Sequence, residues 1–334
     1  MRILIIKMSS LGDIIHTLPA ITEIKHNLPN SHITWLVEPG FKEVPTWHSG
    51  VDKVITMPLR NLKQNLKSTA SYLKVIAQLK LLRAQQFDLI IDAQGLLKSA
   101  LMAKIAHGAS AGLCKQSAKE PIASSLYDKV ITVTKNQHAV LRTKELCAGA
   151  CAYTPGPQAD YNLINKNLKR KNNIVLFHGT TWPNKHYPPQ NWQQLIKLIA
   201  KDGYNILLPW GNEIEHERAK MLGQLTGTKV LPKLTLTELK NIISESKGAI
   251  GVDTGLSHLA AATATPCVAI YGPTRPDLSS NYGHSQAQIA SNYGCAPCMK
   301  RKCSITSVPN EHPCMKNISP LTAWQQLQKI FLTN

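Results

Sequence analysis

Blocks of apolar residues alternate along the chain with blocks in which apolar and polar positions are mixed. Continuous apolar runs predict strands over 2–8, 32–38, 51–57, 87–95 and 129–134. Apolar residues recur every three or four positions over Ile14–His26 and from Leu66 to Leu81, which predicts amphipathic helices. Strands that alternate with helices form parallel sheets covered on both faces. The first half of the chain is therefore expected to be a doubly wound α/β domain.

The same pattern restarts after a stretch, 153–173, that is rich in Pro, Gly, Asn and Lys. It predicts strands at 173–181, 204–211, 247–255 and 266–274, and helices at 192–201, 213–225, 256–263 and 320–332. We predict a domain over 1–155, a linker over 156–172, a second domain over 173–318 and a terminal helix over 319–334. The expected fold is α/β, with two Rossmann-like domains of mostly parallel strands facing across a cleft, where ligands of such folds bind.

The loop after the first strand combines Ser9, Ser10, Gly12 and Asp13. Gly12 allows the backbone to approach a ligand closely, and the two serines offer hydroxyl and N–H groups. Asp13 stands at the start of a helix, where it has two interpretations. It is either the N-cap of that helix or a general base at the edge of a ligand site.

Two loops of the second half have the composition of a phosphate site. Thr180, Thr181 and Lys185 follow a strand and offer two hydroxyls and an ammonium group to a diphosphate. Thr254 and Gly255 open a helix after another strand, so their N–H groups suit phosphate oxygens. The carboxylate of Asp253 is expected to accept from sugar hydroxyls or to cap the turn, and His258 is either a ligand or a core histidine.

Several signatures are absent from the sequence. No GxGxxG follows the first strand, which disfavours a dinucleotide-dependent oxidoreductase, and no GxSxG indicates a hydrolase. No Asp-x-Asp is present to hold a metal–diphosphate complex. Protein groups are then expected to stabilise a leaving diphosphate without a metal or other cofactor.

The chain is strongly basic, with 38 Lys and Arg against 20 Asp and Glu and a formal net charge of +18. Between Lys53 and Phe87 there is no acidic residue but seven basic ones: Lys53, Arg60, Lys63, Lys67, Lys74, Lys80 and Arg83. Such a run is either a solvated helix face or a surface for an anionic membrane or a phosphorylated substrate. Only 6% of residues are aromatic, and no nucleic-acid-binding signature is present, so nucleic acid is disfavoured.

The apolar runs are too short for a signal peptide or a membrane span, so a cytoplasmic location is expected. Four of the eight cysteines cluster as Cys295-x2-Cys298-x4-Cys303-x10-Cys314. The Cys-x2-Cys pair resembles part of a zinc site, for which His312 is a competing ligand. The alternative is a group of small buried thiols.

Five segments together resemble the heptosyltransferases of lipopolysaccharide inner-core synthesis, which are glycosyltransferases with two Rossmann-like domains (GT-B). The segments are KMSSLGDIIHTLPA, FDLIIDAQGLLKSA, HGTTWPNKHYPPQNW, GVDTGLSHLAA and VAIYGPT. The resemblance covers nearly the whole chain and is strongest to heptosyltransferase I, whereas the cysteine-rich tail looks more like heptosyltransferase II. It implies inverting transfer of L-glycero-D-manno-heptose from ADP-heptose to the Kdo of Kdo2-lipid A, at the cytoplasmic face of the inner membrane.

The resemblance also implies roles for individual residues. Asp13 would be the base, and Arg60, Lys98, Lys119 and Arg142 would face the acceptor. The donor would be held by Ser9, Ser10, Gly12, Thr180, Thr181, Lys185, Glu215 at the ribose, Leu234 at the adenine, Asp253, Thr254, Gly255 and His258. Heptosyltransferase II or III, with a heptosylated acceptor, is the alternative within the family. A non-catalytic protein that binds anionic lipid or nucleic acid is the alternative outside it.

Overall fold

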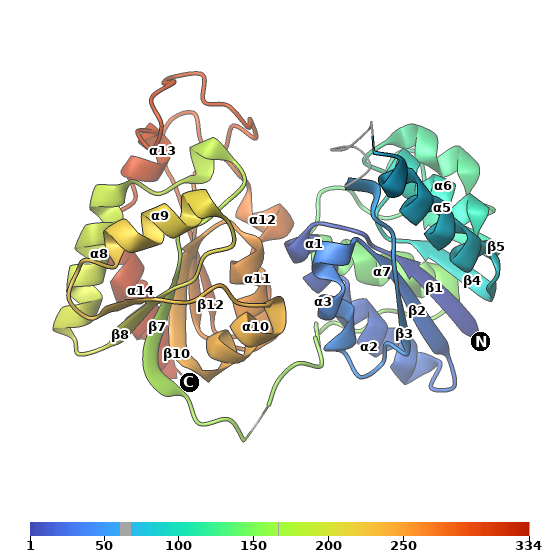
Figure 1. Cartoon of the computed structure of the whole chain (residues 1–334), viewed down its shortest axis with the longest axis horizontal. Coiled ribbons are helices and arrows are strands. Elements are labelled where there is room, and N and C mark those ends of the chain that lie inside the picture. The colour runs from blue at the N-terminus through green and yellow to red at the C-terminus, as the bar shows by residue number, and fades with distance from the viewer. Residues whose placement is uncertain (61–67, 166, 334) are drawn as a thin grey trace. The chain divides into compact units, whose positions relative to one another are not determined.

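The computed structural model describes residues 1–60, 68–165 and 167–333 (Figure 1). It divides into two compact units, Met1–Leu163 and Ile164–Asn334. Leu66, Lys63 and Lys67, which belong to features predicted above, lie outside the described ranges. No helix within those ranges is both long enough and apolar enough to cross a bilayer.

The described part of the first unit contains a six-stranded parallel sheet in the order β3-β2-β1-β4-β5-β6. Its strands are β1 (Arg2–Ile6), β2 (His32–Val37), β3 (Lys53–Thr56), β4 (Gln86–Asp92), β5 (His107–Leu113) and β6 (Lys129–Ile131). The helical segments are α1 (Leu11–Ile15), α2 (Leu18–Asn27), η1 (Pro39–Phe41), α3 (Glu43–Thr46), α5 (Thr69–Arg83), α6 (Leu97–Ile105), η2 (Pro121–Leu126) and α7 (Ala139–Cys151). Helices α5 and α6 cover one face of the sheet, and α2 and α7 pack together on the other (Figure 1).

The described part of the second unit repeats this topology, with the order β12-β11-β10-β7-β8-β9. Its strands are β7 (Lys171–Phe177), β8 (Asn205–Leu208), β9 (Thr228–Val230), β10 (Ser246–Val252), β11 (Cys267–Tyr271) and β12 (Gln286–Ala290). The helical segments are η3 (Pro183–Lys185), α8 (Pro189–Lys201), α9 (Glu213–Leu222), α10 (Leu236–Glu245), α11 (Gly255–Ala262), α12 (Pro276–Ser279), α13 (Pro313–Lys316) and α14 (Pro320–Thr333). The expectation of two doubly wound domains with parallel sheets is therefore confirmed.

One predicted helix differs from the structure, and several elements were not predicted. The single helix expected over 14–26 is two helices, because Pro19 has no backbone N–H and opens α2 instead of continuing α1. The sequence analysis left the strands β5, β9 and β12 and the helices α6, α7 and α10 unassigned. Strand β5 shows why. Its Gly112 is required because a Cβ there would lie 2.2 Å from the Tyr127 ring, and a strand built from small residues has no apolar pattern to read.

The unit boundary after Leu163 falls inside the predicted linker 156–172. The first residues of that stretch are tied to the first unit. Lys144 Nζ donates to the carbonyls of Gly156 and Gln158, and Thr22 Oγ1 donates to the carbonyl of Asp160. The terminal helix α14, for which the sequence indicated no contact, packs on α8 and on β10–β12, and Trp324 Nε1 donates to Asp202 at 2.6 Å.

Candidate active site

In each sheet the order in which successive strands are added reverses at one point. The predicted site residues follow the strands on either side of that point. In the first unit the reversal lies between β1 and β4, and in the second between β7 and β10. Ser9 to Asp13 follow β1, whereas Thr180 and Asp253 follow β7 and β10. The carboxyl ends of the strands at a switch point are the usual ligand site of such sheets. The topology thus brings each set of predicted residues to a binding edge of its own unit.

The loop after β1 is held by a side chain from the neighbouring strand end. Gln94 Oε1 accepts from the N–H groups of Met8 and Ser9 at 2.9 and 3.2 Å, and its Nε2 donates to the Ser9 carbonyl at 2.7 Å. One glutamine therefore pairs three backbone groups at the start of this loop.

Asp13 lies at the third position of α1, not at its N-cap. The N-cap is Ser10, whose N–H and Oγ–H donate to Asp13 Oδ2 at 2.9 and 2.6 Å. The N-cap interpretation of Asp13 is therefore wrong, because the carboxylate reaches back to the cap from inside the first turn. These two bonds hold the carboxylate beside the N-terminus of α1, where the loop ends.

A cavity of about 150 Å³ opens beside Asp13 in the first unit. Three cationic side chains line it with the carboxylate: Lys7, Lys119 and Arg142. Arg142 is positioned by a bond from its guanidinium to the Ser117 carbonyl at 2.6 Å. Burial lowers the pKa of Arg142. Three cations around one carboxylate make this cavity suited to an anionic molecule.

Lys7 follows the apolar strand β1 and is only 8% exposed, and its Nζ donates to the Ala93 carbonyl at 2.5 Å. Burial lowers its pKa, whereas the carboxylates of Asp13 and Asp92 act in the opposite direction.

The other two predicted acceptor residues form a separate group around Glu38. The Arg60 N–H donates to Glu38 Oε1 at 3.1 Å, and its guanidinium lies 5.5 Å from the centre of the Phe41 ring. Burial raises the pKa of Glu38, and the charges of Arg60 and Lys98 counteract that rise. Arg60 is thus bonded to Glu38, and Lys98 acts on the same carboxylate through its charge. Neither of these cations lines the cavity that contains Lys119 and Arg142.

Asp253 is the centre of the predicted donor site in the second unit. It is 7% exposed, and its Oδ2 accepts from Lys185 Nζ at 2.6 Å and from Thr274 Oγ1 at 2.7 Å. Thr180 Oγ1 donates to the backbone carbonyl of Asp253 at 3.3 Å. The structure therefore brings Thr180, Lys185 and Asp253 together, with the carboxylate neutralising the ammonium group.

The loop after β10 leads directly into α11. Thr254 is its N-cap and Gly255 its first residue, so their N–H groups stand at the positive end of the helix dipole. His258 is 6% exposed on the same helix. Thr181, in contrast, is exposed, and no contact with the other predicted residues places it.

Glu215 lies against the loop after β7. Its Oε2 accepts from the Gly211 N–H at 2.8 Å, and a Cβ on Gly179 would lie 2.5 Å from its carboxyl group. Gly179 must therefore remain glycine for Glu215 to occupy this position. Leu234 is half-buried in the segment between β9 and α10, to which Trp210 is joined by a bond from Nε1 to the Leu231 carbonyl.

The clustered cysteines differ in burial. Cys295 is exposed, Cys298 and Cys303 are half-buried, and only Cys314 is buried. Burial raises the pKa of Cys314 to about 11, with smaller contributions from the other three thiols. The interpretation as small buried thiols therefore applies to Cys314 alone.

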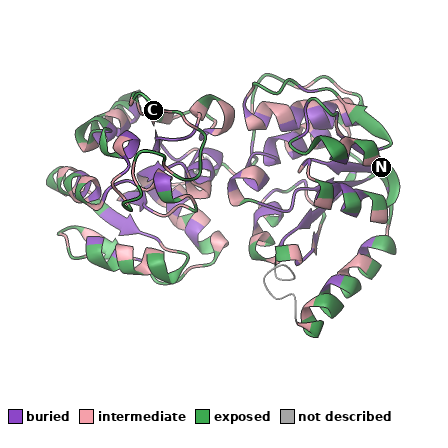
Figure 2. Cartoon of the chain, turned by 90° about the horizontal axis from the view of Figure 1, so that it is seen from above, coloured by how far each residue is buried: buried purple, intermediate pink, exposed green. Residues whose placement is uncertain are grey.

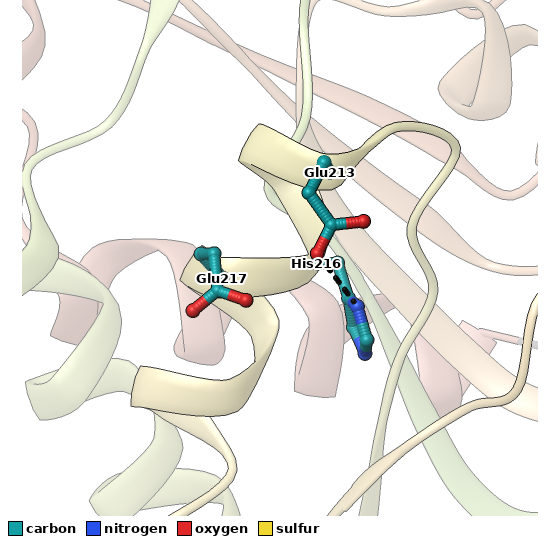
Figure 3. Close-up of side chains that lie close together, drawn as sticks. All are labelled: Glu213, His216 and Glu217. Atoms are coloured by element: carbon teal, nitrogen blue, oxygen red, sulfur yellow. Dashed lines mark ion pairs between the residues drawn. The ribbon is translucent and has the colours of Figure 1, made fainter.

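One group in the described ranges has three metal-ligand atoms within 4.8 Å of one another: Glu213, His216 and Glu217 on α9 (Figure 3). The four thiols do not form such a group. His216 Nδ1 lies 3.4 Å from Glu213, its ring stacks on Trp210, and Glu217 pairs with Lys220. These contacts account for the group as paired side chains on a helix surface.

Sequence reasoning missed Lys7, Gln94 and Thr274. Lys7 was detectable as the single charge that ends an apolar run, and Thr274 as the hydroxyl that follows β11. Gln94 had no signal of its own, since its role depends on β4 lying beside β1.

Comparisons with known proteins place this chain among characterised transferases. The sequence profile of glycosyltransferase family 9 (heptosyltransferase) matches residues 75–308. The lipopolysaccharide heptosyltransferase 1 of Pseudomonas aeruginosa is 38% identical over 99% of this chain and 98% of its own length. The structure of E. coli heptosyltransferase WaaC with ADP is similar at a TM-score of 0.87 and 35% identity, covering 99% of this chain and 100% of that one. The same enzyme with ADP-2-deoxy-2-fluoro heptose gives a TM-score of 0.84 at 35% identity, covering 98% and 99%.

Proposed function

The chain belongs to glycosyltransferase family 9, the heptosyltransferases, and from that membership we propose that it is a heptosyltransferase I. It transfers L-glycero-D-manno-heptose from ADP-heptose to the Kdo of Kdo2-lipid A in lipopolysaccharide core synthesis. The observation that carries the proposal is the cavity in which the Asp13 carboxylate stands among Lys7, Lys119 and Arg142. A carboxylate among cations suits an acceptor that is itself anionic and must lose a proton.

The proposed chemistry is a single displacement at the anomeric carbon. Asp13 takes the proton of the acceptor hydroxyl while the hydroxyl oxygen forms a bond to the anomeric carbon. The bond from that carbon to the diphosphate oxygen breaks. The configuration inverts and ADP leaves. Retention through a glycosyl-enzyme would need a second carboxylate about 5 Å from the first. The described residues that line the Asp13 cavity include no second acid.

The second unit is proposed to hold the donor. Lys185, Thr180, Thr181 and the N-terminus of α11 at Thr254 and Gly255 bind the diphosphate and balance the charge that develops as ADP leaves. In the structure Lys185 is paired with Asp253, so donor binding redirects the ammonium toward phosphate and leaves Asp253 to accept from sugar hydroxyls. Glu215 contacts the ribose, Leu234 the adenine and His258 the heptose.

The remaining predicted residues complete the assignment. Arg60, Lys98, Lys119 and Arg142 bind the anionic groups of the acceptor, and Ser9, Ser10 and Gly12 contact the donor sugar. Because Kdo2-lipid A is lipid-linked, the protein is proposed to act in the cytoplasm at the inner face of the inner membrane.

Mass spectrometry of the product tests this function. The purified chain is incubated with ADP-heptose and Kdo2-lipid A, and the product is expected to gain one heptose. A parallel reaction offers the acceptor that already carries the first heptose. Transfer only to that second acceptor indicates heptosyltransferase II or III. Absence of transfer to either acceptor, with ADP-heptose left intact, contradicts the proposal and favours a non-catalytic binding protein.

A further inference from the structure

The outer side of α5 is apolar although it faces solvent. Val75 and Leu82 attach the helix to the core of the first unit. On the opposite side Leu73 is 61% exposed and Ile76 46% exposed. Tyr72 and Leu81 are 42% and 57% exposed. Figure 2 shows the helix that follows the grey segment as largely exposed along its length. A helix of a monomeric enzyme normally turns polar residues outward.

Exposed apolar residues also occur on two neighbouring segments. Helix α5 contacts α6, and α6 contacts η2, all on the same face of the sheet. Leu97 and Leu101 on α6 are 39% and 46% exposed, and Ile122 on η2 is 65% exposed. We call this set the outer apolar face: Tyr72, Leu73, Ile76, Leu81, Leu97, Leu101 and Ile122. In the described part of the first unit, Met1 and Val130 are the large exposed hydrophobics that lie elsewhere.

The charges on this face have one dominant sign. Helix α5 carries Lys74, Lys80 and Arg83, helix α6 carries Lys98 and Lys104, and neither helix has an acidic residue. Two acidic residues lie nearby. Glu120 accepts from the Leu97 N–H at 2.7 Å, and Asp128 lies 3.8 Å from Lys104. Exposed hydrophobic side chains among cations are typical of helices that lie in the interface of an anionic bilayer.

We infer that the outer apolar face is the surface by which this protein docks on an anionic lipid bilayer. Its apolar side chains enter the interface, and the cations of α5 contact lipid phosphates. The choice of a bilayer over a protein partner follows from charge complementarity, and it rests on the proposed function, in which the acceptor is a lipid-linked anion. A basic and apolar face matches such a membrane in both properties.

Co-sedimentation of the full chain with vesicles tests the inference. The vesicles contain phosphatidylglycerol in phosphatidylcholine, with phosphatidylcholine alone as the neutral comparison. Lys74→Gln/Lys80→Gln is expected to weaken binding to the anionic vesicles about 30-fold, since each cation near the surface contributes roughly 5-fold. Leu73→Gln/Ile76→Gln is expected to weaken it about 10-fold or more. Leu321→Gln/Lys329→Gln alters an exposed apolar residue and an exposed lysine on α14 and is expected to bind like the unaltered protein.

The outcomes that overturn the inference are distinct. Equal vesicle binding by Leu73→Gln/Ile76→Gln and the unaltered protein excludes the face as the docking surface. If sedimentation velocity shows a dimer that the same variant converts to a monomer while vesicle binding is unchanged, the face joins two copies of the chain instead. Loss of binding by the α14 variant to the same degree also contradicts the assignment, because it indicates a response to charge anywhere on the protein.

A second readout separates this inference from the proposed function. Turnover is measured with Kdo2-lipid A in vesicles and with a deacylated, water-soluble form of the same acceptor. The Leu73→Gln/Ile76→Gln variant is expected to lose activity only on the vesicle-bound acceptor. Equal loss on both acceptors overturns the inference. If the unaltered protein transfers heptose to neither acceptor, the proposed function fails, while vesicle binding still decides whether the face docks on lipid.

Discussion

The carboxylate of Asp13 has a structural role and a proposed catalytic one. Its Oδ2 accepts two hydrogen bonds from Ser10, which order the first turn of α1, and the same group is proposed to remove the acceptor proton. Replacement by alanine would abolish both functions, so a loss of activity would not separate them. A test of catalysis must keep the oxygen that Ser10 uses.

Asp13→Asn keeps an oxygen for the Ser10 N–H but cannot take up a proton. We expect kcat to fall about 10²–10⁴-fold, the usual contribution of a general base. The affinity for ADP and the melting temperature should remain close to those of the unaltered protein. Steady-state kinetics, calorimetric titration with ADP and thermal unfolding measure the three quantities.

Asp88→Asn is the matched control. Asp88 is an exposed aspartate of the same unit that also accepts a backbone N–H, from Arg2 at 2.6 Å. Its replacement should leave kcat unchanged. Full activity in Asp13→Asn would reject Asp13 as the base.

Lys185 and Asp253 form a largely buried pair, which the donor diphosphate would open in the proposed site. Lys185→Ala removes a charge-assisted hydrogen bond to phosphate, for which we expect roughly 10–100-fold weaker ADP binding. The variant also leaves Asp253 as an uncompensated anion near the phosphates. Lys185→Ala/Asp253→Asn should therefore recover part of the lost affinity. Calorimetric titration measures the ADP affinity of the single and the double variant. Lys197→Ala, on the exposed side of α8, is the control. Unchanged ADP affinity in Lys185→Ala would exclude this lysine from the phosphate site.

A site residue is predictable from the sequence when the strand or loop next to it in the chain fixes its position. Asp13, Thr180 and Asp253 each follow a strand whose apolar run is legible in the sequence, and the structure places them at the expected loops. The separation of Arg60 and Lys98 from Lys119 and Arg142 was not legible. It depends on Glu38 and Ser117, which reach these cations through tertiary packing.

Strands also differ in how far local sequence predicts them. Strand β1 is four buried aliphatic residues after Arg2, so its pattern predicts it unambiguously. Strand β5, His-Gly-Ala-Ser-Ala-Gly-Leu, is small because Tyr127 packs on Gly112 and donates from its hydroxyl to the buried Asp92 at 2.7 Å. The ring that comes from 15 positions later explains the composition of the strand, and no window of local sequence contains both.

Helices α2 and α7 and the chain that leaves the first unit meet at one ammonium group. Lys144 is 1% exposed and lies 3.1 Å from Glu23 of α2. Its Nζ also donates to the carbonyls of Gly156 and Gln158, at 2.6 and 2.5 Å. Glu23 in turn accepts from the Gly156 N–H at 2.8 Å. One side chain thus joins three segments that the sequence separates.

Lys144→Met keeps much of the volume of the side chain and removes its charge. We expect the free energy of unfolding of the first unit to fall by about 3–5 kcal/mol, because Glu23 and two carbonyls lose their donor in a buried place. Chemical denaturation measures the change, and Lys135→Met, at an exposed lysine of the same unit, is the control. A loss below about 1 kcal/mol would show that water replaces the ammonium without cost.

Both units contain a buried histidine that resists protonation. His48 in the first unit is 1% exposed, and burial lowers its pKa to about 4. Its Nδ1 accepts from the Gly50 N–H at 2.9 Å, a bond that a proton on that nitrogen would break. His178 in the second unit is also 1% exposed, and burial and the nearby Arg218 lower its pKa to about 4. The whole chain already carries a net charge of +18, so added protons increase repulsion as well.

These histidines predict that both units lose stability in mild acid. An unfolded histidine titrates near pH 6.5, so between pH 6.5 and 4 the unfolded state binds more protons than the folded state, and stability falls as pH decreases. Each histidine is expected to contribute about 2 kcal/mol of destabilisation between pH 7.5 and pH 5.

Glutamine in place of a buried histidine cannot take up the proton. In His178→Gln the unfolding free energies at the two pH values should therefore differ by about 2 kcal/mol less than in the unaltered protein, whatever the variant does to stability at pH 7.5. His284→Gln, at an exposed histidine of the same unit, should keep the full difference. If His178→Gln and His284→Gln lose the same stability on acidification, the proton that destabilises the second unit binds elsewhere, and the general positive charge of the chain becomes the better explanation.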